Sequence, residues 1–270
     1  MKSPSPRLAI FLIVLLDVMG FGLIIPSQPF LAKHFGATAA VVTLLGTTYS
    51  AMQFLLAPVW GTLSDRFGRR SILLITIAMT MAGHATFAAS TSLLMLFLAR
   101  GLAGTGAANI ATAQAVLADT HAPEERSRAM ALVGAAFGLG FIFGPAIGGV
   151  LFQIDQRAPA AFGSMLAAVN FLFVLFFLPE TRTHTHAHSR HRAKLSDLFS
   201  AGAQLKQLVC TTLLCITAFA LMEQSVGLFI EYHWVMPGSA TAMQQATKLT
   251  SLFLVVVGVA ATLVLGIFVR

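Results

Sequence analysis

Four ionisable residues lie inside long apolar segments of the chain, where a charge is costly. Asp17 falls ten residues after Arg7, Arg100 lies about nine residues into a fourth apolar run, and Glu223 lies in a seventh. His84, in a third run, could relay protons or could be a core histidine. Ten helical residues rise about 15 Å, so Asp17 is expected near the middle of a span. An ionisable group at that depth marks a functional site by default, and a carboxylate there can take up and release a proton.

Each of these side chains needs a partner or a polar cavity. Arginine stays charged, so Arg100 needs an acidic or multi-acceptor partner, and Asp17 is the obvious candidate. Structural alternatives stay open, because Asp17 could bond a neighbouring helix and Glu223 could lie near a membrane interface. Tyr49 and Gln53 share one helical face at i and i+4, which suits a polar cavity wall and, nearly as well, bundle packing.

The composition indicates a membrane protein. Of the 270 residues, 57% are hydrophobic and 10% charged, against about 25% charged in a soluble domain, and the mean hydropathy is +0.82. A soluble enzyme, a nucleic-acid binder and a disordered protein are therefore excluded. Eight runs are long enough to cross a bilayer as helices. They cover residues 8–29, 40–62, 71–89, 92–115, 129–152, 158–178, 206–230 and 249–269.

The basic residues predict the orientation. With the N-terminus in the cytoplasm, thirteen of the seventeen lysines and arginines fall in inner segments, three in outer ones and Arg100 in a span. Cytoplasmic loops carry this excess in membrane proteins. We therefore predict a multi-pass protein of a bacterial inner membrane with a cytoplasmic N-terminus.

A polar segment divides the spans six plus two. The prediction is a six-helix N-terminal bundle over residues 1–178, a cytoplasmic linker rich in His and Arg over 179–205, and two helices of a second bundle over 206–270. Six short-looped helices, a charged connector and further helices are typical of the first part of a two-bundle transporter.

The second and third runs are joined by the loop GTLSDRFGRR. Two glycines permit a tight turn and close helix approach, and the aspartate can accept hydrogen bonds from the arginines or a helix N-terminus. A plain positive-inside loop is the simpler alternative. The residues concerned are Gly61, Asp65, Arg66, Gly68, Arg69 and Arg70.

Four motifs in order resemble one family. GTLSDRFGRR resembles the signature loop of the major facilitator superfamily, and the chain resembles in particular its drug:proton antiporters, including tetracycline and multidrug efflux transporters. The other three motifs are LDVMGFGLIIPSQP in the first run, RGLAGTGAAN in the fourth and GFIFGPAIGG in the fifth. The resemblance implies a major facilitator fold. It also implies that Asp17 and Arg100 serve proton coupling and substrate handling, on a pathway that we expect to include Tyr49, Gln53, Asn109 and Glu223.

The fifth-run motif consists of Gly140, Gly144, Pro145, Gly148 and Gly149. Its glycines at every fourth position form a bare stripe for close helix packing, and the proline kinks the helix. In the family this stripe meets the eighth helix and is associated with export. The eighth run offers a matching small stripe, although packing inside one bundle would use the same glycines. That second stripe consists of Gly258, Thr262 and Gly266.

Two departures from the family weaken the finer assignment. Tetracycline exporters carry an acidic residue in the third helix, where this chain has Gly83 and His84. Helices nine to twelve are missing, so the chain is expected to be truncated after the eighth helix. The resemblance implies that Asp65 belongs to a cytoplasmic gate and pairs with the opposite half when the transporter faces outward, by docking against the eleventh helix, which this chain lacks.

The resulting hypothesis is a proton-coupled secondary transporter that exports small apolar or amphiphilic compounds. The alternatives are a truncated, transport-inactive fragment of such an exporter, and a metabolite or sugar transporter of the same superfamily. The expected partners are protons, a small-molecule substrate, the lipid bilayer and a second chain supplying further helices, with no nucleic acid. The sequence has no G-x-x-x-x-G-K-[ST] loop and no catalytic or metal-ligand constellation, so we predict neither an enzyme, nor a cofactor, nor a metal site.

Overall fold

The structure, a computed structural model, describes residues 6–107, 109–120, 123–180, 202–235 and 241–268. All regular structure in these ranges is helical, and eight helical segments are long and apolar enough to cross a membrane. The helices are α1 (Pro6–Ile24), α2 (Gln28–His34), α3 (Ala39–Phe67), α4 (Arg69–Ala88), α5 (Leu93–Ala107), α6 (Asn109–Thr120), α7 (Pro123–Ile154), α8 (Ala158–Phe177), α10 (Ala203–Trp234) and α11 (Ala242–Phe268).

The sequence predicted one helix over residues 8–29, but the structure has two helices there. α1 ends at Ile24, and a tight turn leads into the separate short helix α2. Pro26 disfavours helical continuation, while Pro29 sits at the start of α2, where its missing N–H costs nothing. The Ser27 hydroxyl donates to the Ile24 carbonyl at 2.9 Å and closes the turn.

The predicted runs 206–230 and 249–269 leave residues 231–248 between them, and this gap is too long. α10 continues to Trp234 and α11 begins at Ala242. Backbone hydrogen bonds form as readily between polar residues as between apolar ones, so both helices extend beyond their hydrophobic segments. The predicted linker over 179–205 lies mostly in residues 181–201, outside the described residues, and the three-part division stays a prediction.

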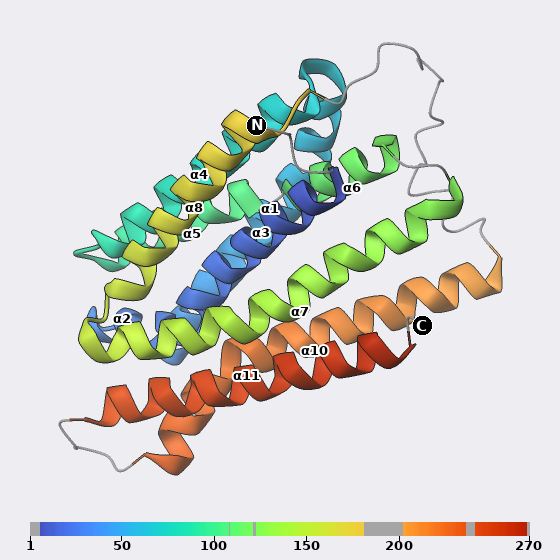
Figure 1. The fold of residues 1–270 in the computed structure, drawn as a ribbon. Coiled ribbons are helices and arrows are strands. Elements are labelled where there is room, and N and C mark those ends of the chain that lie inside the picture. The colour runs from blue at the N-terminus through green and yellow to red at the C-terminus, as the bar shows by residue number, and fades with distance from the viewer. Residues whose placement is uncertain (1–5, 108, 121–122, 181–201, 236–240, 269–270) are drawn as a thin grey trace.

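Helix α7 lies between the other N-terminal helices and the α10–α11 pair (Figure 1). α1 packs on α7 and α8, α4 packs on α5 and α8, and α11 packs on the other side of α7. α10 contacts α11 and, over a smaller area, α3. α7 is therefore the shared wall of the two groups of helices.

Three glycines of the α7 stripe pack on α1, which is the second of the two arrangements left open by the sequence, packing inside one bundle. A Cβ added to Gly144 would lie 2.8 Å from the Gly22 Cα, and one added to Gly148 would lie 2.4 Å from the Leu23 carbonyl oxygen. Gly140 faces α1 in the same way. The stripe therefore lets two backbones approach within the N-terminal group of helices.

α11 uses the neighbouring face of α7. A Cβ on Gly138 would meet Thr262 Oγ1 at 2.4 Å, and one on Gly149 would meet Ser251 Oγ at 2.3 Å. Gly258 lies against the backbone of Phe141. The small residues predicted on the eighth span thus do face α7, at Gly258 and Thr262, while the surroundings of Gly266 lie outside the described residues.

The two ends of the molecule differ. At the end that carries α2, called the α2 end, Lys33 Nζ and Glu231 Oε2 form an ion pair at 2.6 Å between α2 and α10. Gln153 Nε2 donates to the Gln244 carbonyl at 3.1 Å between α7 and α11, and Phe30 packs with Phe152, Val235 and Ala246. At the opposite end, called the arginine end for Arg7, Arg66, Arg69, Arg70 and Arg126, residues 203–218 of α10 are all exposed. α10 therefore touches the N-terminal helices toward the α2 end and stands apart from them at the arginine end, while α11 stays against α7 as far as Thr262.

Candidate functional site

A cavity of about 760 Å³ lies between the N-terminal helices and the α10–α11 pair. This volume suits a drug-sized ligand. The residues that line it come from α1, α3, α6, α7, α10 and α11. Most of the lining surface is apolar or aromatic. The polar lining residues are Asp17, Thr43, Thr47, Tyr49, Ser50, Gln53, Thr217, Glu223 and Gln224.

The cavity carries one carboxylate on each side. Asp17 lies on α1, and Glu223 lies opposite on α10 with 9% of its surface exposed. The Gln224 amide donates to Glu223 Oε1 at 3.1 Å. Gln224 also lies directly over Gly46 of α3, where an added Cβ would come within 2.0 Å of its Oε1. The sequence placed both carboxylates within spans, and the structure brings them to one cavity.

Arg100 does not form the expected ion pair with Asp17. None of the ion pairs between described residues involves Arg100. Its guanidinium carbon instead lies 4.5 Å from the ring centre of Tyr49 and 5.7 Å from that of Phe21. Both distances are within the range of cation–π attraction, which replaces the carboxylate as the source of stabilisation.

The Phe21–Tyr49 pair separates Arg100 from the cavity. The two rings stack with centres 4.9 Å apart and line the cavity, whereas Arg100 is 1% exposed and does not. Its Nε and Nη1 have no hydrogen-bond partner among the described residues. Arg100 is thus a buried cation with unused donors behind an aromatic wall.

The structure places the other residues considered for the pathway as follows. Tyr49 and Gln53 share the cavity wall on α3, and Gln53 Nε2 donates to the Ala107 carbonyl of α5 at 3.2 Å. Asn109 begins α6, but its side chain lies outside the described residues. His84 is away from the cavity, because its ring is packed between Gly20 of α1 and Gly163 of α8.

Arg69 is the centre of the GTLSDRFGRR loop. Its Nη2 pairs with Asp65 Oδ1 at 2.7 Å, its Nε with Asp119 Oδ2 at 3.1 Å, and its Nη1 donates to Ser64 Oγ at 2.6 Å. Its backbone N–H donates to Glu180 Oε1 at 3.0 Å. Asp65 therefore pairs with an arginine of its own loop, which is one of the partners predicted from the sequence.

The other loop residues have distinct surroundings. Gly68 has φ +99°, which favours glycine, and an added Cβ would lie 2.4 Å from Glu180 Oε2. Arg70 donates to the Leu175 carbonyl of α8, and Arg66 is exposed over the Phe67 ring. The close approach predicted at Gly61 is wrong among the described residues, since an added Cβ there would meet nothing within 4 Å.

Sequence reasoning missed two acidic partners of the loop, Asp119 at the end of α6 and Glu180 after α8. The available signal was their place at the ends of apolar runs predicted to finish on the same side as the loop. Phe21 was also missed, because an apolar residue in an apolar span carries no distinguishing signal. Within the described residues, no group of three or more His, Cys, Asp or Glu side chains could hold a metal ion.

The sequence model of the Major Facilitator Superfamily matches residues 10–270. The chain belongs to this superfamily. Tetracycline resistance protein class B of Escherichia coli is 39% identical over 183 residues, which are 67% of this chain and 45% of that protein. The class E protein of Escherichia coli is 31% identical over 229 residues, 84% of this chain and 56% of that protein. The chain thus spans about half the length of these curated relatives.

Solved structures agree with the fold. The crystal structure of the human organic anion transporter MFSD10 (TETRAN) has a TM-score of 0.69 at 25% identity, covering 96% of this chain and 73% of that one. A bacterial homologue of the human lysosomal transporter Spinster gives 0.69 at 16% identity, covering 93% and 58%. The predicted all-α membrane fold and superfamily are therefore confirmed, and the known members similar to this chain are transporters rather than enzymes.

Proposed function

We propose that this chain acts as a proton-coupled secondary transporter that exports small apolar or amphiphilic compounds. The observation that carries the proposal is the cavity of about 760 Å³ with Asp17 and Glu223 on opposite sides. Apolar and aromatic walls suit the body of such a compound, and its polar groups would meet the few hydroxyl, amide and carboxyl groups. Two tetracycline resistance proteins at 39% and 31% identity support the export direction.

In this proposal Asp17 exchanges the proton. Protonation removes a negative charge from the cavity wall. The cavity then binds a polar or cationic group of the substrate less tightly, which favours the conformation that opens at the other end. Glu223 lies on the α10–α11 pair, so its distance from Asp17 changes when that pair moves relative to α1. Proton binding at one wall is thereby linked to the relative position of the two groups of helices.

The contacts at the two ends suggest the movement. The α2 end is closed by Lys33 and Glu231 and by the Phe30 cluster, while residues 203–218 of α10 stand apart from the N-terminal helices at the arginine end. With the arginines in the cytoplasm of a bacterial inner membrane, this arrangement opens the cavity inward. Export then requires the α2-end contacts to break, while the Arg69 loop approaches the opposite side as a cytoplasmic gate.

Transport can be tested with the purified chain in liposomes carrying an imposed proton gradient. The probes are tetracycline and a fluorescent lipophilic cation, compared for the wild type, Asp17→Asn and the control Glu125→Gln. Glu125 is an exposed carboxylate that pairs with Arg7 at the arginine end, so its substitution also turns a carboxylate into an amide, but outside the cavity. We expect gradient-dependent transport that falls at least about tenfold in Asp17→Asn only. Equal transport in all three chains would refute the role of Asp17.

A second candidate function is export of organic anions. It is favoured by the buried Arg100, whose Nε and Nη1 lack hydrogen-bond partners among the described residues, and by the similarity to a human organic anion transporter. An anionic dye in the same liposomes separates the two candidates. Transport of neither probe class would favour the hypothesis that this chain alone does not transport.

A further inference from the structure

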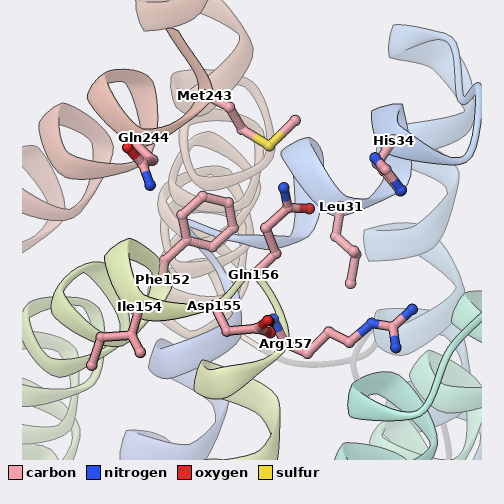
Figure 2. Close-up of a pocket in the computed structure, with 9 residues that line it drawn as sticks. All are labelled: Leu31, His34, Phe152, Ile154, Asp155, Gln156, Arg157, Met243 and Gln244. Atoms are coloured by element: carbon pink, nitrogen blue, oxygen red, sulfur yellow. Dashed lines mark hydrogen bonds between the residues drawn. The ribbon is translucent and has the colours of Figure 1, made fainter. Parts of the chain in front are cut away.

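A second pocket, of about 490 Å³, lies at the α2 end, outside the central cavity (Figure 2). One wall comes from α2 and from the α7–α8 connection, and the other comes from the first turn of α11. Nothing in the proposed transport cycle uses this pocket. Its size is nevertheless within the range of small-molecule sites.

The position of the pocket is that of a membrane–water interface. The apolar span of α7 ends at Ile154, that of α8 starts at Ala158, and that of α11 starts at Ala242. Residues 155–157 therefore lie between two spans, at the depth of lipid headgroups. A ligand that fits here needs a charged part at the rim and an apolar part along the helices.

The rim carries both signs of charge. Asp155 Oδ1 accepts the backbone N–H of Arg157 at 2.7 Å, and Arg157 Nη2 donates to the Ser90 carbonyl at 2.9 Å. The rest of the Arg157 guanidinium forms no other hydrogen bond or ion pair with the described part of the chain. His34, on α2, and Gln156 line the same pocket without a hydrogen-bond partner among the described residues (Figure 2).

Apolar side chains also contribute to the pocket. Leu31, Phe152 and Met243 line it, and Figure 2 shows the Gln156 amide extending between Phe152 and Leu31. Ile154 beside them is 77% exposed. An acyl chain descending from the rim would cover this residue, whereas a purely water-soluble ligand would leave it bare.

We propose that this pocket binds the headgroup of a zwitterionic phospholipid of the phosphoethanolamine type. The phosphate accepts hydrogen bonds from Arg157 and His34, the ammonium donates to Asp155, and the acyl chains run past Ile154. In the protein, the Arg157 guanidinium and the Asp155 carboxylate are two residues apart. In the headgroup, the phosphate and the ammonium are joined by two carbons, so the phosphate can meet Arg157 while the ammonium meets Asp155. Since Met243 and Gln244 belong to α11, a bound headgroup ties α11 to α2 and α7 and favours the conformation closed at this end.

The test measures phospholipid retained by the purified full chain, using native mass spectrometry after incubation with phosphatidylethanolamine or phosphatidylglycerol. The variants are Arg157→Gln, Asp155→Asn and the control Lys248→Gln, in which an exposed lysine one turn along α11 from the pocket is neutralised. We expect Arg157→Gln to bind both lipids at least about tenfold less tightly, because a charged hydrogen-bonding group is lost. Asp155→Asn should remove only the preference for phosphatidylethanolamine, and Lys248→Gln should change neither lipid.

Each departure from this pattern overturns the assignment. Equal retention by Arg157→Gln and Lys248→Gln would exclude the pocket, and an unchanged lipid preference in Asp155→Asn would exclude the ammonium contact. Asp155→Asn keeps an oxygen for the Arg157 N–H, so it tests the site even if Arg157→Gln fails to fold. Displacement of the lipid by equimolar water-soluble glycerophosphoethanolamine would show that the headgroup alone is the ligand and would overturn the role of the acyl chains.

Discussion

The aromatic surroundings of Arg100 lead to a quantitative prediction for Tyr49. The guanidinium lies 4.5 Å from the Tyr49 ring centre and 5.7 Å from that of Phe21. Replacing Tyr49 with Leu removes the nearer ring and leaves a fully buried cation facing only the farther one. A desolvated cation–π contact is worth about 2 kcal/mol, so we expect Tyr49→Leu to lower the free energy of unfolding by at least about that amount.

Two comparisons isolate the ring. Tyr49→Phe keeps the ring, and the Tyr49 hydroxyl has no hydrogen-bond partner among the described residues, so we expect a loss of under about 0.5 kcal/mol. Tyr232→Leu makes the same change at a residue that is 82% exposed and should be equally mild. Unfolding is measured in mixed micelles by titration with a denaturing detergent.

Tyr49→Leu also loses packing, and a double-mutant cycle with Arg100→Gln subtracts that contribution. The cycle should give a coupling free energy of about 1–2 kcal/mol between the ring and the guanidinium. A coupling below about 0.3 kcal/mol, or a Tyr49→Phe variant as unstable as Tyr49→Leu, would refute the claim that the aromatic wall stabilises the Arg100 charge.

Three further substitutions follow from close contacts. Gly68→Ala should cost about 1–3 kcal/mol of unfolding free energy, because φ is +99° and the new Cβ would lie 2.4 Å from a carboxylate oxygen; an unchanged denaturation midpoint would contradict this. Gly144→Val should destabilise by more than about 2 kcal/mol because its Cβ strikes the α1 backbone, whereas a Cβ added to Gly134 would meet nothing within 4 Å, so Gly134→Val should be tolerated in the same assay. Lys33→Glu should widen the spin-label distance between α2 and α10, and adding Glu231→Lys should restore it; no change in either chain would show that this ion pair does not hold the α2 end closed.

The sequence predicted those site residues whose type is rare in their segment, such as a charged residue in an apolar run. Asp17 and Glu223 are ionisable groups in apolar runs, and their cost in lipid was enough to place them at an internal cavity. Phe21 and Gln224 could not be chosen in this way. They matter through contacts with Tyr49, Glu223 and Gly46, which are distant in sequence or depend on a side-chain direction.

The sequence by itself determined the spans, the superfamily and the helical faces that carry small residues. Apolar length sets a membrane span, and 3.6-residue periodicity sets which residues share a face. The tertiary structure alone decided which neighbour each face meets. The stripe through Gly144 packs on α1 rather than α11, and Arg69 reaches Asp119 and Glu180 from two other segments.

The physical reason is that helical periodicity leaves the rotation and pairing of whole helices undetermined. Rotating a helix about its axis exchanges the neighbours of a buried side chain, so the local sequence does not decide whether Arg100 meets a carboxylate or aromatic rings. The choice follows from packing summed over several helices at once, to which the α1–α7 contact and the Phe30 cluster both contribute. No single segment contains that sum, so the partners of Arg100 and of the α7 glycines emerged only in three dimensions.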